Sequence, residues 1–158
     1  MIPVESIDSG PGYDTAEEAI AAAKAHPLQS KARADGARFA GRGFVDAWRD
    51  DGQWVLEFSN GLWLRVFNDG RHVLWAVEES RPDVTAVEGP QILVWPSGAV
   101  SRTDAAVVAR DRRGAEFWQF FVTELGFHVY LRRKLILCFS PVCRRDTGEP
   151  LLHVWEDD

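Results

Sequence analysis

Between residues 38 and 79, short apolar runs alternate with pairs of turn-forming residues. Asp51-Gly52, Asn60-Gly61 and Asp69-Gly70 separate segments of six to twelve residues that are rich in Val, Leu, Phe and Trp. Asn-Gly and Asp-Gly are typical of type I′ turns, in which both central residues need a positive φ. The pattern predicts four antiparallel strands joined by tight turns, with a positive φ at both Asn60 and Gly61.

Two-residue loops at these turns determine which side chains of neighbouring strands face each other. The expected facing pairs are Asp46 with Glu57, Trp48 with Val55, Phe58 with Trp63, Trp54 with Phe67 and Val66 with Val73. Because side chains alternate along a strand, the sheet then has two faces that are both apolar. One face carries Trp48, Val55, Leu62, Leu64, Val66, Val73, Trp75 and Val77; the other carries Trp54, Leu56, Phe58, Trp63, Phe67, Leu74 and Ala76, with Arg49, Arg65 and His72.

Outside this region, the pattern predicts two helices and several shorter strands. Thr15 and Glu18 form a capping box before an alanine-rich stretch that Pro27 ends, which predicts a short N-terminal helix. Apolar positions at helical spacing predict a long helix over residues 104–125, with Gly126 as its C′ residue. Further strands are expected at 91–95, 99–102, 127–131, 135–140 and 151–155.

These elements predict a single α+β domain over residues 1–158, with residues 1–13 as an extended lead-in. The strands come in hairpin-linked runs, which disfavours a parallel βαβ arrangement. We therefore expect one long, twisted antiparallel meander sheet of about eight or nine strands. Since one long helix covers only one face, the sheet is expected either to curl into a barrel-like form or to be covered by a second layer or another chain.

Charge and cysteine content narrow the function classes. The chain has a net charge of −6, and an acidic chain without a basic domain disfavours nucleic acid as a partner. Cys138 and Cys143 have a C-x4-C spacing that fits no zinc or redox signature, and no cofactor or metal is expected. No apolar run approaches the 18 or so residues of a membrane span, and no signal-peptide pattern occurs. We expect a cytoplasmic protein that does not bind membranes.

Candidate catalytic residues are few, because the sequence contains no nucleotide-binding, zinc-protease or serine-hydrolase motif. The expected register places Asp46 opposite Glu57 on an apolar face. Two desolvated carboxylates side by side raise one pKa, which is how general acids are made. His72 and His128 are weaker candidates for an acid–base partner. The simpler interpretation is that Asp46 lies near the end of the sheet, or that Arg42 neutralises the pair.

The aromatic residues are the stronger functional signal. In the expected register Trp54, Phe58, Trp63 and Phe67 share one face with Arg65, and monomeric proteins rarely leave such a patch uncovered. We therefore predict that these five residues form a binding surface.

Three functions are consistent with the sequence. The first is a non-enzymatic protein-binding domain, for example an inhibitory or immunity-type protein that acts on a basic bacterial effector; size and acidity are the only grounds for that version. The alternatives are a small hydrolase or nucleotide-acting enzyme that uses the carboxylate pair and a histidine, and a self-associating structural subunit.

Overall fold

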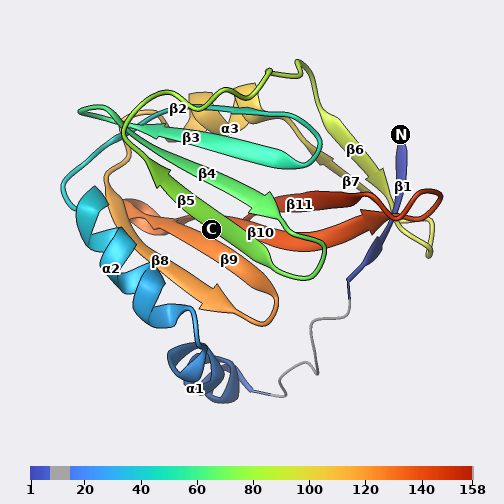
Figure 1. Cartoon of the computed structure of the whole chain (residues 1–158), viewed down its shortest axis with the longest axis horizontal. Coiled ribbons are helices and arrows are strands. Elements are labelled where there is room, and N and C mark those ends of the chain that lie inside the picture. Colours follow the sequence, from blue (N-terminus) through green and yellow to red (C-terminus); the bar gives the residue numbers. More distant parts are fainter. Residues whose placement is uncertain (8–14, 158) are drawn as a thin grey trace.

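The computed structural model describes residues 1–7 and 15–157 and is an α+β fold with two stacked sheets (Figure 1). Residues 8–13 of the expected lead-in lie outside the described residues, whereas residues 2–6 form a strand. The described elements are β1 (Ile2–Ser6), α1 (Ala16–Ala25), α2 (Gln29–Phe39), β2 (Phe44–Arg49), β3 (Gln53–Phe58), β4 (Leu62–Asn68), β5 (Val73–Glu78), β6 (Gln91–Val94), β7 (Val100–Thr103), α3 (Ala105–Arg112), β8 (Phe117–Thr123), β9 (Gly126–Leu131), η1 (Arg132–Lys134), β10 (Leu135–Arg144) and β11 (Pro150–Asp157).

The meander predicted between residues 38 and 79 is confirmed. Strands β2, β3, β4 and β5 form an antiparallel four-stranded sheet in that order. Asn60 and Gly61 both have a positive φ, of 64° and 72°, as the turn signal predicts. The pairing of Asp46 with Glu57 is also as expected.

The register between β3 and β4 differs from the prediction by one residue. Three residues rather than two connect these strands, so that Phe58 pairs with Leu62 and Trp54 pairs with Val66. Ser59 leaves the ladder because its backbone N–H donates to the Gly43 carbonyl and its hydroxyl accepts from the Gly43 N–H. A shift of one residue moves every side chain of one strand to the other face relative to its neighbour.

The register between β4 and β5 also differs, but without exchanging the faces. Four residues connect these strands, and Val66 pairs with Trp75 rather than with Val73. Asp69 organises the turn, since its carboxylate accepts from the backbone N–H groups of Arg71 and His72. A shift of two residues preserves the alternation of side chains.

The remaining strands form a seven-stranded sheet, not the continuation of one meander, and neither sheet is a closed barrel. Its order is β7-β6-β1-β10-β9-β8, with β11 paired to β10, and β1 runs parallel to β6. The hairpin expected at 91–102 is confirmed as β6 and β7. Strands β9, β10 and β11 confirm those expected at 127–131, 135–140 and 151–155.

The inner faces of the two sheets share one core. Trp75 of β5 stacks on Phe127 of β9 with ring centroids 4.5 Å apart, and Trp54 of β3 meets Phe139 of β10 edge-on at 5.9 Å. Phe39 of α2 closes one end of this core against the rings of β8. The core therefore takes one face of each sheet and leaves the other face of each sheet outside it.

The long helix predicted over residues 104–125 is wrong. Helix α3 ends at Arg112, and Gly114 follows with a φ of 88°. Residues 117–123 form a strand that buries Phe117, Phe120 and Val122 in the core. Gly126 has a φ of 144° in the β8–β9 turn and is not a helix C′ residue.

The predicted N-terminal helix is present as α1. The hydroxyl of Thr15 accepts from the backbone N–H of Glu18, which is one half of the expected capping box. A second helix, α2, was not predicted, because residues 28–37 are polar and show no clear pattern; its Ala32 and Gly36 pack towards the core.

Candidate functional site

The side chains of β2–β5 that point away from the seven-stranded sheet form what we call the outer face. Trp63, Arg65 and Phe67 of the predicted binding residues lie there and are half-buried. Trp54 and Phe58 do not, because the one-residue register shift turns them inwards. Both are 0% exposed in the core, so their expected place on a binding surface was wrong.

Arg65 lies at the centre of the outer face and is held from three sides. Its guanidinium is 3.3 Å from the carboxylate of Glu78, donates to Gln53 at 3.2 Å, and lies 4.7 Å from the ring of Phe67. These contacts fix the arginine over the sheet, and much of its charge is balanced by Glu78. The cation therefore does not dominate this surface.

Carboxylates outnumber cations among the outward side chains of the four strands. Glu57 and Glu78 pair across the ladder with Trp63, one on each side, and Asp46 pairs with Glu57. The only basic residue in these strands besides Arg65 is Arg49, which points inwards and is 1% exposed. The outward side chains of the four strands thus include three carboxylates and one guanidinium, while Arg81 and Arg113 reach Trp48 and Asp46 from other segments.

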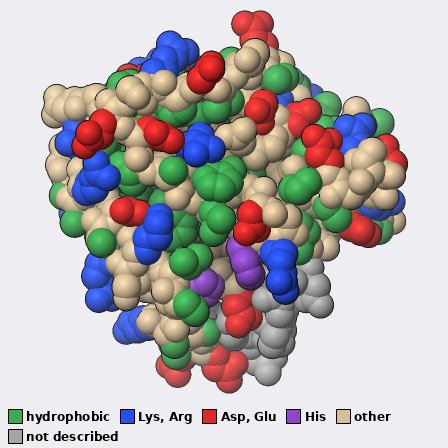
Figure 2. Space-filling model, viewed as in Figure 1, with side chains coloured by type: hydrophobic (Ala, Val, Ile, Leu, Met, Phe, Trp, Pro, Cys, Tyr) green, Lys and Arg blue, Asp and Glu red, His purple; other side chains and the backbone are tan. Residues whose placement is uncertain are grey.

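The chain itself covers one side of the outer face. Segment 79–90 follows the β2 edge, where the N–H of Val87 donates to the Arg49 carbonyl at 2.7 Å. Arg81 from the same segment lies over the ring of Trp48, 4.7 Å from its centroid. Figure 2 shows hydrophobic side chains gathered over the middle of this face, with acidic and basic side chains around them. The β4–β5 side therefore remains the accessible part.

The Asp46–Glu57 pair is adjacent but not desolvated. Half of the Asp46 side chain is exposed, at 50%, and its carboxylate accepts from the N–H of Ala47. Arg113 is 3.9 Å away and provides weak compensation. Arg42, the expected neutralising residue, instead donates to backbone carbonyls of the β3–β4 turn. The two carboxylates are therefore not in the desolvated environment that the catalytic interpretation requires.

The two candidate histidines do not join this pair. His72 is exposed just before β5, whereas Glu57 lies level with Glu78 at the other end of that strand, about 20 Å away at 3.3 Å per residue. His128 is buried in β9 of the other sheet, with its Nε2 3.0 Å from the hydroxyl of Thr123. The structure does not bring the four candidate catalytic residues together.

A cleft of about 570 Å³ lies where the α1–α2 connection, the β4–β5 loop and the β8–β9 turn meet. Sequence reasoning missed this site, because its residues come from loops far apart in the chain and none belongs to a motif. Two histidine side chains are visible side by side below the hydrophobic patch in Figure 2. The lining includes His26, Leu28, Arg71, His72, Leu74 and Glu124.

His26 is bound to its own loop at the edge of the cleft. Its Nδ1 accepts from the backbone N–H of Leu28 at 3.1 Å. Burial and the neighbouring His72 lower the pKa of His26, and Glu124 opposes that shift. Because an N–H can only donate, Nδ1 is unprotonated in this bond, and the neutral ring carries its proton on Nε2.

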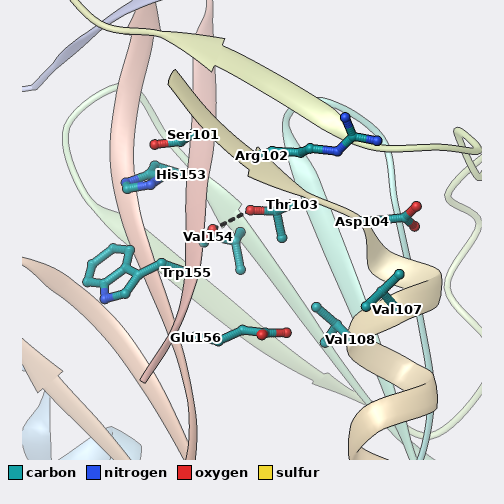
Figure 3. Close-up of a pocket in the computed structure, with 10 residues that line it drawn as sticks. All are labelled: Ser101, Arg102, Thr103, Asp104, Val107, Val108, His153, Val154, Trp155 and Glu156. Carbon is teal, nitrogen blue, oxygen red and sulfur yellow. Dashed lines mark hydrogen bonds between the residues drawn. The ribbon is translucent and has the colours of Figure 1, made fainter. Parts of the chain in front are cut away.

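A second hollow, of about 440 Å³, lies between β7, α3 and β11 (Figure 3). The hydroxyl of Thr103 donates to the Val154 carbonyl at 2.6 Å, and Glu156 pairs with the buried Arg112 at 2.8 Å. Burial lowers the pKa of His153, whose ring stacks on Trp155. Thr103 and Glu156 are thus engaged in contacts that hold β7, α3 and β11 together.

Residues 1–7 and 15–157 contain neither a metal-binding cluster nor a helix fit to span a membrane. No set of three or more His, Cys, Asp and Glu side chains among them is arranged to hold a metal ion. None of the helices described there has both the length and the apolarity to cross a membrane. Comparison of the chain with protein-family models, with curated proteins and with solved structures found no match.

Proposed function

We propose that the chain is a non-enzymatic protein-binding domain whose outer face takes a basic partner. The observation that carries this proposal is the composition of that face, where half-buried Trp63 and Phe67 stand among three carboxylates and one guanidinium. Tryptophan is among the side chains that most often dominate binding energy, and large aromatic rings such as that of Phe67 add much apolar contact area.

Charge supports the choice of a basic partner. The excess of carboxylates on the outer face has the same sign as the net charge of −6 of the whole chain. Complementary charge raises association rates and disfavours acidic partners. An inhibitory or immunity-type protein is the version of this proposal in which binding blocks the partner's activity.

The exposed side of the face supports a contact centred on β4 and β5. Segment 79–90 already covers Trp48 near β2, whereas Trp63, Phe67 and Leu74 keep part of their surface accessible. Glu57 and Glu78 flank Trp63 in the ladder. A partner's lysine or arginine side chains can therefore reach a carboxylate on either side of the indole ring.

Affinity capture from an extract of the source cells tests the proposal. The immobilised proteins are the wild type, Trp63→Ala and Glu57→Lys. The matched controls are Trp118→Ala, which removes a half-exposed tryptophan of β8, and Glu149→Lys, which makes the same charge change in the β10–β11 loop.

We expect one basic protein to be retained by the wild type and both controls and to be lost with both outer-face variants. Equal retention by all five proteins would contradict the proposal. Sedimentation equilibrium tests the alternative of a self-associating subunit. If the wild type is a dimer and Trp63→Ala is a monomer, self-association is favoured over a foreign partner.

A further inference from the structure

Trp118 of β8 has no place in the outer face, yet it is the most exposed of the seven tryptophans, all of which lie in the described residues. It is 49% exposed. Its ring lies 6.1 Å from that of Tyr130, and the ring of Phe121 lies 5.9 Å from the same tyrosine. A half-exposed indole supported by other rings is a surface on which a further flat ring can stack.

A hollow of about 480 Å³ lies on one side of Trp118, between β8 and the helices α1 and α2 (Figure 1). Helix α2 follows the edge of β8, where the side-chain oxygen of Gln29 accepts from the N–H of Val122 at 3.1 Å. Lys24 of α1 and Arg33 of α2 line the hollow. Its described lining contains no Asp or Glu, in contrast to the two hollows described above, each of which contains a carboxylate.

The two cations of this hollow are not balanced by the chain. Lys24 and Arg33 are both exposed, and neither forms an ion pair within residues 1–7 and 15–157. Other surface arginines, such as Arg38 and Arg144, do pair with carboxylates. The hollow is therefore locally positive, although the whole chain has a net charge of −6.

Positive charge also lies on the other side of Trp118. Strand β9 pairs with the edge of β8 opposite α2, and a second hollow of about 330 Å³ reaches from Trp118 to Tyr130 and Leu131 of β9. Arg132, the next residue, places its guanidinium 5.4 Å from the centre of the indole ring. It is exposed and has no carboxylate partner among the described residues. Cations on both sides of one exposed ring favour a chain of negative charges over a single anion.

We propose that this surface binds a single-stranded nucleic acid, with a base stacked on Trp118 and phosphates neutralised by Lys24, Arg33 and Arg132. Exposed rings among basic side chains suit this ligand, because every base has a flat face and every nucleotide carries a negative charge. The three basic side chains are long and exposed and a single strand is flexible, so the site needs no fixed separation between ring and phosphate.

The acidity of the whole chain sets the strength of this binding. Repulsion by a net charge of −6 opposes a polyanion, so we expect weak binding that is measurable at low salt and lost as salt rises. The surface shares no residue with the outer face, and the two proposals are therefore independent.

Three labelled ligands of about ten nucleotides test the proposal on the full chain by fluorescence anisotropy at low salt. Oligothymidylate carries bases and phosphates, an abasic strand carries phosphates alone, and a duplex keeps its bases stacked on each other. We expect saturable binding of oligothymidylate, and binding of the other two that is about fivefold weaker or worse, because neither can stack a base on Trp118. Thymidine monophosphate should compete only at a much higher concentration than the unlabelled strand.

Variants separate stacking from charge. Trp118→Ala should weaken oligothymidylate binding about fivefold or more and leave abasic binding unchanged, whereas Trp118→Phe should keep most of the affinity. Arg33→Gln should weaken both strands and reduce the slope of log affinity against log salt by about 0.7. Arg102→Gln, the same change at an exposed arginine of β7, should have no effect.

Several results would overturn this assignment. They are an absence of saturable binding at low salt, equal affinity for oligothymidylate and the abasic strand, and competition by thymidine monophosphate as effective as that of the strand. Because the wild type alone gives the ligand comparison, a folding defect in a variant does not hide the outcome. Failure of this test leaves the outer-face capture experiment unaffected.

Discussion

Replacing Gly126 by alanine should destabilise the fold far more than replacing Gly41, although both glycines have a positive φ. Gly126 has a φ of 144°, and a Cβ added there would overlap the carbonyl group of Phe139 on β10. Gly41 has a φ of 77°, and an added Cβ would meet nothing within 4 Å. The pair separates the cost of backbone conformation from the cost of the overlap.

The magnitude follows from these two terms. A non-glycine residue in a backbone region reserved for glycine costs about 1–3 kcal/mol, and forcing an extra carbon into a packed site costs about 1–3 kcal/mol more. Gly126→Ala should therefore lower the free energy of unfolding by about 2–6 kcal/mol, against about 1–2 kcal/mol for Gly41→Ala. Since the free energy of unfolding of a domain is about 5–15 kcal/mol, Gly126→Ala removes a large part of the stability.

Urea unfolding followed by tryptophan fluorescence measures both variants, because seven tryptophans report on the core and the surface. An equal loss for Gly126→Ala and Gly41→Ala would refute the close packing of the β8–β9 turn on β10.

Three further predictions concern the core, a buried ion pair and pH. Trp54→Ala should lower the free energy of urea unfolding by about 3–5 kcal/mol, and Trp63→Ala by clearly less, because only Trp54 is fully buried. Glu156→Gln should destabilise by about 1–3 kcal/mol, since it leaves the guanidinium of Arg112, 2% exposed, without its carboxylate; adding Arg112→Met should recover part of this loss in the same assay. Burial lowers the pKa of His153 from 6.5, so the unfolded chain takes up this proton first and stability is lost as the pH falls below 6.5; His153→Asn should show a smaller loss between about pH 7.5 and about pH 5.5.

The sequence predicted the strands of the meander well because local chemistry determines them. Asn60-Gly61 adopts the expected positive φ values, and the alternation of apolar residues holds within each strand. The predicted register failed at the same turn, because Ser59 forms hydrogen bonds with Gly43, which lies in the connection between α2 and β2. Loop length at a turn thus depended on a tertiary contact that no local pattern contains.

Residues 117–123 were misassigned because their apolar positions fit either a helix or a strand. Five of these seven residues are apolar, and a run of this kind has no distinct period. The strand is decided by Phe39 of α2, whose ring packs against Phe117 and Phe120. The cleft was not predictable at all, as Arg71 and Glu124 are brought together only by the turns of two different sheets.

The most direct test of the central claim is the affinity of the captured basic protein for the wild type and for Glu57→Lys, measured at low and high salt. If the outer face is the binding site, reversing this charge beside Trp63 should weaken binding about tenfold or more at low salt, and the difference should shrink as salt screens it. Glu149→Lys, with the same change of net charge, should bind like the wild type. Equal affinities for Glu57→Lys and Glu149→Lys would contradict the account.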